Sequence, residues 1–308
     1  MITHKMPRSY PIPDHEGLES CYYHHKNIKD KNILLRISKS SLGEFTFCQQ
    51  QYFIKRCIGM KEPQNENMLR GTNVHDAVEL FYNTLDMDYA KTLKDEELKD
   101  YFKKSFPVPD EPYYLDEDLH IDRFIDIEVK RFFKSNLDNF LPTGNEIVVN
   151  HIETIEVDGI KQDVHFTGII DRIFTNADGS LHIHELKTGQ WKDSPFKLEN
   201  MRKEMAFYVW LMRKAHPDSK VTHWGWDHTK GLLGGDDTAY RFVEPVRVKE
   251  ITLFLTDLQN LIRTHRKYKG EGKGSMFKLL APGAQYRICD PWCALKEFCP
   301  RYRPEESL

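Results

Sequence analysis

The sequence lacks an apolar run long enough to cross a membrane. No stretch of eighteen apolar residues occurs, and the opening Met-Ile-Thr-His-Lys-Met-Pro-Arg has no apolar segment like that of a secretory signal. Internal repeats are absent, and so is the Gly-x-x-x-x-Gly-Lys-[Ser/Thr] loop with which helicases hold nucleotide phosphates. These absences predict a soluble, cytoplasmic protein that has no membrane partner and does not itself unwind duplexes.

An excess of charge of either sign is also missing. The chain contains 44 Lys plus Arg against 47 Asp plus Glu, which gives a formal net charge of -3. Because positive and negative charges are nearly equal in number, the chain as a whole does not attract polyanions. Any nucleic-acid site must therefore be a local patch. With 308 residues, of which 40% are apolar, the chain can build one large core or two small ones.

Cysteine is scarce. The six cysteines, at positions 21, 48, 57, 289, 293 and 299, are too few for a secreted scaffold held together by disulfides. Three of them, Cys289, Cys293 and Cys299, nevertheless fall within eleven residues of one another. This crowding indicates a metal site near the C-terminal end of the sequence.

Hydrophobic periodicity predicts the order of helices and strands. Residues 1–37 show no sustained period and are predicted to form an N-terminal arm. Helices are predicted over 38–60 with a cap at Ser38 or Ser40, after Gly71 with a cap at Thr72, in two pieces within 86–143, over 199–215 and over 248–268. Strands are predicted over 147–157, 164–174, 181–187, 221–227 and 240–246.

The first three strands are predicted to form an antiparallel meander, because Asp158-Gly159 and Asp178-Gly179 are turn dipeptides. The whole order predicts a mixed α/β sheet flanked by helices within residues 38–308. The segment 86–143, rich in Asp, Glu and Lys, is predicted to be a helical insertion.

Two carboxylates and a lysine are predicted to share one face of this meander. Side chains alternate between faces along a strand, and the hairpin centre near Asp178 lies midway between Asp171 and Glu185, so these two should lie roughly 5 Å apart. Such a pair repels unless a cation lies between, and oxygen ligands suit Mg²⁺ or Mn²⁺. Lys187, on the same face as Glu185, would place an ammonium beside that cation.

A simpler interpretation of the same residues remains open. Asp171 and Glu185 could be ordinary residues of a sheet edge, and Lys187 could be solvated. His182 and His184 point to the opposite face from Glu185 and are interpreted as structural.

In combination, these residues resemble the motifs of the RecB-like branch of the PD-(D/E)XK nuclease superfamily. Gly71-x-x-x-His75 is similar to the motif on its first core helix, Gly168-x-x-Asp171 to Gly-x-x-Asp, and Glu185-x-Lys187 to Glu-x-Lys. The resemblance implies a restriction-endonuclease-like fold in which His75, Asp171, Glu185 and the Leu186 carbonyl bind Mg²⁺ or Mn²⁺. It also implies that Asp171, Glu185 and Lys187 are catalytic. Without the other motifs, His75 would be interpreted as a polar residue on the shoulder of an amphipathic helix.

One position departs from the family pattern. The family places Gln-x-x-x-Tyr on the helix after the lysine strand, whereas this sequence has Glu204-x-x-x-Tyr208. Both side chains share one helix face and are candidates for DNA contact. A carboxylate at position 204 would repel a phosphate unless it is paired with a cation such as Arg202, Lys203 or the metal. The alternative for Tyr208 is a half-buried helix aromatic.

The C-terminal cysteines also belong to a family resemblance. The run Cys289-x-x-x-Cys293-x-x-x-x-x-Cys299-Pro needs a fourth thiolate, for which Cys21, Cys48 and Cys57 are available. The segment from Ser38 through Cys48 to Tyr52 resembles the first ligand segment of iron–sulfur nucleases in the same branch. That resemblance implies a structural [4Fe-4S] cluster on Cys48, Cys289, Cys293 and Cys299, in a lobe built from residues 38–60 and 280–300. A zinc site and unliganded thiols are the alternatives.

Contacts with DNA are predicted less sharply. Five basic residues could neutralise phosphates or could simply be a solvated helix end: Arg263, Arg266, Lys267, Lys269 and Lys273. Trp191, Phe196 and Tyr208 could stack on unpaired bases or could belong to the core.

The resemblance as a whole implies a metal-dependent deoxyribonuclease. Its expected substrate is single-stranded DNA or DNA with free ends, cleaved by an exonuclease in recombination, repair or spacer acquisition. A helicase or recombination partner would supply unwinding, and the location would be the host cytoplasm if the protein is phage-encoded. The alternatives are a structure-specific endonuclease and a DNA-binding subunit that does not cleave.

Overall fold

The computed structural model contains two compact units. The structure describes residues 33–57, 60, 66–106, 117–135, 137–189, 195–230, 240–271, 277–278, 280, 289, 293–296 and 299. Unit 1 comprises residues 1–63, 150–167 and 252–308, and unit 2 comprises residues 64–149 and 168–251. The long strands β2 (Gly144–Val157) and β3 (Ile160–Thr175) contribute residues to both units.

Unit 1 contains a strand where the sequence predicts only an arm. Strand β1 (Ile33–Ile37) pairs in parallel with the first half of β3, with Arg36 opposite His165. Leu35 and Ile37 are fully buried, so burial on the sheet fixes a segment that is too short to show a period. The rest of the predicted arm, residues 1–32, lies outside the described residues.

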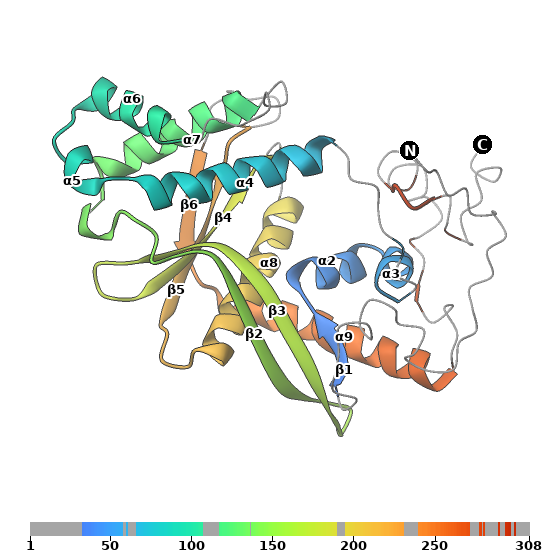
Figure 1. Ribbon diagram of the computed structural model, residues 1–308. Helices are drawn as coiled ribbons and strands as arrows, with labels where there is room; N and C mark the ends of the chain where they lie inside the picture. The colour runs from blue at the N-terminus through green and yellow to red at the C-terminus, as the bar shows by residue number, and fades with distance from the viewer. Residues whose placement is uncertain are drawn as a thin grey trace. The chain divides into compact units, whose positions relative to one another are not determined.

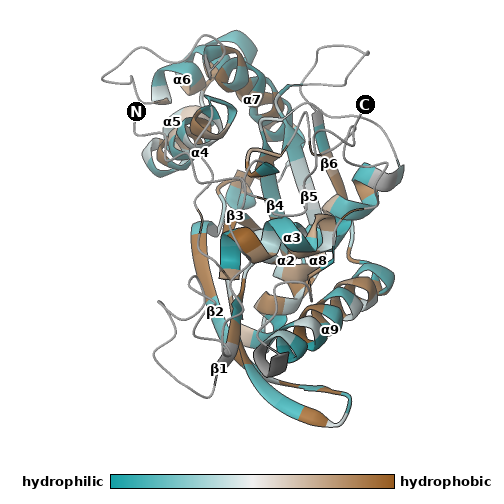
Figure 2. Cartoon of the chain, turned by 90° about the vertical axis from the view of Figure 1, so that its right-hand side faces the viewer, coloured by the Kyte–Doolittle hydropathy of each residue, from teal (hydrophilic) through white to brown (hydrophobic). Residues whose placement is uncertain are grey.

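The helices of unit 1 share an aromatic core. Helix α2 (Lys39–Phe47) begins where predicted, because Ser38 caps it through a reciprocal pair of hydrogen bonds with Ser41. The short α3 (Gln49–Tyr52) and the π-helical η2 (Phe53–Cys57) follow. Helix α9 (Val248–Glu271), which carries both hydrophobic and hydrophilic residues along its length (Figure 2), places His265 Nε2 2.8 Å from the Tyr52 hydroxyl.

The strands form a mixed sheet. The second half of β3 pairs antiparallel with β4 (Leu181–Lys187). Strand β4 pairs in parallel with β5 (Val221–His228). Strand β5 in turn pairs antiparallel with β6 (Tyr240–Pro245). The hydrogen-bonded order is β1-β3-β4-β5-β6, and β2 pairs with β3 (Figure 1). The predicted mixed α/β architecture is confirmed. Its iron–sulfur lobe stays a prediction.

Both predicted turns of the meander are present. Asp158 and Gly159 have φ of +55° and +76°, as the tight hairpin between β2 and β3 requires. The turn between β3 and β4 is wider, because the Asn176 amide donates to the Ser180 carbonyl at 2.7 Å. Asp178 stabilises that turn by accepting hydrogen bonds from the amide and the hydroxyl of Ser180.

Helices cover both faces of the sheet in unit 2. On the face that carries Phe174 and Leu186 lie α4 (Glu66–Thr84), α6 (Asp95–Ser105) and α7 (Glu117–Phe132), which share a core with them. The segment 86–143 also contains α5 (Met87–Ala90) and η3 (Leu137–Asn139). Helix α8 (Pro195–Ala215) packs on β4 and β5. Across the described residues, every helix is too short or too polar to span a membrane.

Helix α4 corrects one predicted boundary. The sequence predicts a start after Gly71 with Thr72 as cap, but the helix already begins at Glu66. The Thr72 hydroxyl donates to the Met68 carbonyl at 3.2 Å, so it bonds within the helix and does not cap it. A Cβ at Gly71 would lie 3.4 Å from Thr188 Oγ1, which shows how near the helix passes to the end of β4.

Candidate active site

Asp171 and Glu185 occupy neighbouring positions on β3 and β4, as the hairpin centre predicts. Arg172 pairs with His184 and Ile173 with Ile183, so Asp171 and Glu185 are the next pair in this register. The Leu186 amide donates to Asp171 Oδ2 at 2.8 Å, which ties the two strands at this point. Two acidic side chains are therefore brought together on adjacent strands, one of them, Glu185, only 1% exposed.

His75 of α4 reaches the same place, together with a residue that no motif contains. His75 Nδ1 lies 3.5 Å from Asp171 Oδ2 and 3.5 Å from Glu146 Oε1. The three ligand-type atoms all lie within 4.8 Å of one another. Burial lowers the pKa of His75, but the hydrogen bond and charge of Glu146 and the charge of Asp171 outweigh it and raise the pKa. This group can hold a divalent cation.

Lys187 lies between two carboxylates. Its Nζ is 2.8 Å from Glu185 Oε2 and 3.2 Å from Glu204 Oε2. Lys187 is therefore a cation that offsets the charge of Glu204. The two cations that the sequence suggested have other partners: Arg202 pairs with Glu244, and Lys203 lies 3.9 Å from Glu199.

Tyr208 is a core residue of this site. It is 4% exposed, and a Cβ at Gly168 would lie 2.8 Å from its Cε1, so the glycine leaves room for the ring. Burial and the nearby Glu185 and Asp171 carboxylates raise the pKa of its phenol. The ring is therefore buried in the absence of DNA, and the predicted contact of Tyr208 with DNA stays a prediction. Trp191 and the Phe196 side chain lie outside the described residues.

A chain of hydrogen bonds holds the backbone of Lys187. Thr229, the residue after β5, donates from its amide and its hydroxyl to the Lys187 carbonyl, at 3.2 and 3.4 Å. His120 Nδ1 lies 2.7 Å from the Thr229 hydroxyl, and Arg123 Nη1 donates to the Thr229 carbonyl at 3.0 Å. Helix α7, within the segment 86–143, is thus connected to the end of the lysine strand.

The opposite face of β4 carries a buried ionic network. His184 Nε2 lies 3.0 Å from Asp227 Oδ1, and Asp227 also binds Arg172 at 2.8 Å and Arg241 at 2.6 Å. Burial lowers the pKa of His184 to about 4, although Asp227 raises it. His182, 3.1 Å from His184, has its pKa lowered to about 2 by burial and by His184. These contacts agree with the interpretation of both histidines as structural.

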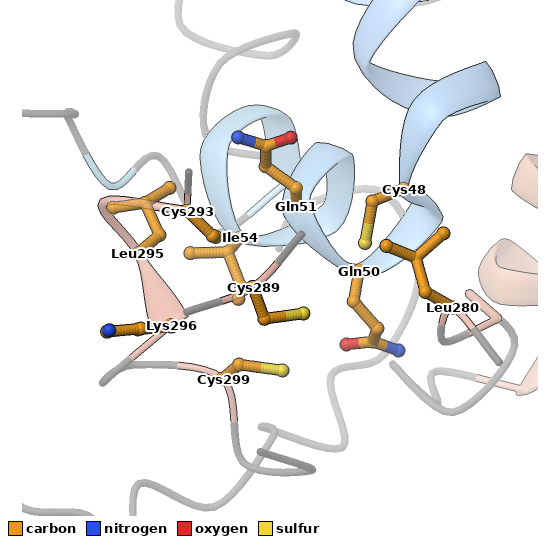
Figure 3. Close-up of a pocket in the computed structure, with 10 residues that line it drawn as sticks. All are labelled: Cys48, Gln50, Gln51, Ile54, Leu280, Cys289, Cys293, Leu295, Lys296 and Cys299. Carbon is orange, nitrogen blue, oxygen red and sulfur yellow. The ribbon is translucent and has the colours of Figure 1, made fainter. Parts of the chain in front are cut away.

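Four cysteines line a pocket in unit 1. Cys48, between α2 and α3, shares it with Cys289, Cys293 and Cys299, and Leu295 and Ile54 add apolar walls (Figure 3). The sulfur atoms of Cys289 and Cys299 extend toward the side on which Cys48 lies (Figure 3). Cys57 is buried and is absent from the pocket lining, and Cys21 lies outside the described residues.

Two of the basic residues of α9, Arg263 and Arg266, form hydrogen bonds with the β2–β3 hairpin. Arg263 binds Asp158 through Nε and Nη2 at 2.9 Å, and Arg266 donates to Gln162 and to the carbonyls of Val157 and Ile160. Lys267 is exposed. The Lys269 side chain and Lys273 lie outside the described residues. Arg263 and Arg266 are thus bonded within the protein and are not a simply solvated helix end, and the predicted contact of this stretch with phosphates stays a prediction.

Comparisons with known proteins give one informative match. A family model described as PD-(D/E)XK nuclease superfamily matches residues 36–300. No match is found among curated proteins.

Two solved structures are similar at low identity. The structure of SSO0001 is 13% identical, with 92% of this chain and 94% of that chain covered and a TM-score of 0.38. A structure named "Putative exonuclease" from Eubacterium rectale is 13% identical, with 88% and 92% covered and a TM-score of 0.47. Likenesses at this level carry no functional assignment.

Proposed function

The chain belongs to the PD-(D/E)XK nuclease superfamily, and from this premise we propose that it is a magnesium- or manganese-dependent deoxyribonuclease of the RecB-like branch. The observation that carries the proposal is the convergence of His75, Asp171, Glu185 and Lys187 at one place in unit 2. The proposed reaction is exonucleolytic hydrolysis of single-stranded or end-exposed DNA. Unwinding would come from a helicase partner, because the sequence has no nucleotide phosphate loop of its own.

The residues present fit a divalent cation. His75 and Asp171 would hold it, with Glu185 and the Leu186 carbonyl completing the set that the family resemblance implies. Carboxylate and carbonyl oxygens are the ligands that Mg²⁺ and Mn²⁺ prefer. When bound, such an ion lowers the pKa of a water ligand and polarises a phosphoryl oxygen.

The side chains have separate tasks in this proposal. The Leu186 amide orients the Asp171 carboxylate by donating to its Oδ2. The Lys187 ammonium offsets the charge that develops on the phosphoryl oxygens during attack. Glu185 and Glu204 hold that ammonium in place, because each accepts from its Nζ. Truncation of Lys187 removes this stabilisation without changing the ligands.

A nuclease assay with matched variants tests the proposal. End-labelled single-stranded and duplex DNA is incubated with Mg²⁺ or Mn²⁺, and with wild type, Lys187→Ala and Lys99→Ala. Lys99 is a suitable control because it also forms a close ion pair, 2.7 Å from Asp126, but lies on α6. We expect Lys187→Ala to lower the rate by about a hundredfold or more. A wild type that binds DNA but never cleaves it would instead support a binding subunit, and internal cuts in closed circles would support an endonuclease.

A second part of the proposal concerns the four-cysteine pocket. We propose that Cys48, Cys289, Cys293 and Cys299 hold a [4Fe-4S] cluster with a structural role. Support comes from the four thiols lining one pocket although they come from distant parts of the sequence. A crosslink between residues 48 and 289 closes a long loop and so strongly restricts the unfolded chain.

The visible spectrum of anaerobically purified protein, with its iron, sulfide and zinc content, tests the cluster. We expect a brown protein whose iron and sulfide are lost in Cys48→Ala and Cys293→Ala. Cys57→Ala is the control, because Cys57 is buried away from the pocket lining. A colourless wild type with one zinc per chain would show that the four cysteines bind zinc and not a cluster. The nuclease proposal would be unaffected by that result.

A further inference from the structure

Glu146 stands outside every sequence motif of the nuclease and yet reaches its centre. Its Oε1 lies 3.5 Å from His75 Nδ1, the same separation that His75 has from Asp171 Oδ2. These three atoms all lie within 4.8 Å of one another. The family resemblance already assigns His75 and Asp171 to the metal. Glu146 therefore lies beside a metal position that is inferred independently of it.

The backbone presents Glu146 at a conformational cost. Its φ is +48°, in the left-handed region that residues other than glycine rarely adopt. The preceding Asn145 anchors the segment, because its Nδ2 donates to the Glu79 carbonyl of α4 at 3.2 Å. Glu79 lies one turn after His75, so the helix that carries His75 also fixes the segment that carries Glu146.

The electrostatics of the group favour a cation. Glu146 and Asp171 lie beside His75, and the charge of Glu185 also acts on it. These carboxylates repel one another unless positive charge lies among them. Lys187 forms ion pairs with Glu185 and Glu204. The side chains of His75 and Glu146 are each 28% exposed and that of Asp171 is 13% exposed, so an ion can enter from solvent.

We propose that Glu146 is a direct ligand of the divalent ion, and that with His75 and Asp171 it gives the site one nitrogen and two carboxylate donors. The inference rests on the proposed metal-dependent function and adds a residue to it. A nitrogen donor suits Mn²⁺ better than Mg²⁺, which prefers oxygen and keeps much of its water. The site should therefore bind Mn²⁺ more tightly than Mg²⁺.

Manganese binding measured without DNA tests Glu146 directly. Free Mn²⁺ is followed by its electron paramagnetic resonance signal during titration of wild type, Glu146→Gln, Asp171→Asn and Glu153→Gln. Glu153 is the matched control, because it also lies on β2 with its Oε2 2.8 Å from a histidine, His151. We expect the Kd to rise about tenfold or more in Glu146→Gln and Asp171→Asn, and to stay within about twofold in Glu153→Gln. Circular dichroism melting checks that each variant is folded.

Salt separates a ligand from a distant charge. The ratio of the Kd values of Glu146→Gln and wild type should be the same at roughly 0.05 and 0.5 M KCl, because a coordinated oxygen is not screened, whereas a through-space effect shrinks. Competition with Mg²⁺ should show a preference for Mn²⁺ that His75→Ala reduces.

The outcomes are distinguishable from failure of the proposed function. If Asp171→Asn loses Mn²⁺ but Glu146→Gln binds as wild type does, or if its defect disappears with salt, Glu146 is not a ligand and the nuclease proposal is unaffected. If wild type binds no Mn²⁺ at all, the metal-dependent function and the role of Glu146 are both wrong.

Discussion

Lys187 Nζ lies 3.2 Å from Glu204 Oε2, so the residue that departs from the motif of the RecB-like branch, which the sequence resembles, is an ion-pair partner of Lys187. That branch has an amide side chain at the corresponding position. Here a carboxylate shares the ammonium with Glu185, whose Oε2 is 2.8 Å away. The negative charge of Glu204 is therefore compensated within the protein, but it still faces any phosphate that Lys187 approaches.

Glu204→Gln should strengthen DNA binding. The amide oxygen can still accept from Lys187, while the repulsion between the carboxylate and a phosphate is removed. Because the Glu204 side chain is 38% exposed, this repulsion is screened and is worth about 0.5–1 kcal/mol. We expect KM for DNA to fall about two- to fivefold with kcat within about twofold. Steady-state kinetics measure both, and a fall in kcat of tenfold or more would show that the carboxylate itself is required.

Thr229→Val should lower kcat. Valine keeps the shape of threonine and its backbone amide, which still donates to the Lys187 carbonyl. It lacks the hydroxyl that also donates to this carbonyl and that accepts from His120, so the end of β4 loses part of its anchor. Small displacements of a catalytic group cost up to a hundredfold, and we expect about tenfold in kcat with KM unchanged. Thr229→Ser should recover most of the loss. Thr222→Val, at the other end of β5, is the control. Equal losses in Thr229→Ser and Thr229→Val would argue against the hydrogen bond.

Gly168→Ala should destabilise the protein through Tyr208. The new methyl group would lie 2.8 Å from Tyr208 Cε1, so the ring or the strand must move, at a cost of about 1–3 kcal/mol. Gly43→Ala is the control, because nothing lies within 4 Å of its added Cβ and helix α2 favours alanine. Thermal melting measures both. Adding Tyr208→Leu to Gly168→Ala should restore part of the stability, and no recovery would place the strain elsewhere.

The free energy of unfolding should fall on acidification below about pH 6.5. Burial holds the pKa of His184 at about 4 and that of His182 at about 2 in the folded protein, whereas an unfolded histidine titrates near 6.5. Between these pH values each imidazole is protonated in the unfolded chain but neutral in the folded protein. Each imidazole therefore lowers the free energy of unfolding by about 1.4 kcal/mol for every pH unit of acidification.

Urea unfolding at several pH values between 7.5 and 5 measures this loss. His182→Gln should make the unfolding free energy depend less steeply on pH, by the contribution of one imidazole, because glutamine does not titrate. His216→Gln is the control, since His216 is exposed in the folded protein. An unchanged slope in His182→Gln would mean that His182 is not held neutral by burial.

The sequence predicts those parts of the site that depend on local pattern. The alternation of β4 and the Asp178-Gly179 turn are local, and they are enough to place Asp171 beside Glu185. The start of α2 is also local, because Ser38 and Ser41 are three residues apart and cap each other. The sequence predicts that Asp171 lies beside Glu185, and it predicts a helix start with Ser38 or Ser40 as the cap; the structure identifies Ser38.

The missed features depend on contacts between distant segments. Glu146 adopts its positive φ where Asn145 binds a carbonyl of α4, and the only local sign is the turn-type pair Gly144-Asn145. Thr229 and His120 are 109 positions apart, so no spacing rule connects them. Helix α4 begins before Gly71 although glycine disfavours helix interiors, because the buried Val74 and Val78 fix the helix from beyond that point.

The pocket of unit 1 takes one thiol from position 48 and the other three from positions 289 to 299. During synthesis Cys48 leaves the ribosome long before its three partners exist, whereas Asp171, Glu185 and Lys187 are all made earlier than Cys289. Whatever these four thiols bind is therefore acquired only after the carboxylates and the lysine have been translated. A message truncated between codons 188 and 288 would yield a chain with all three of those residues but with a single thiol of the pocket.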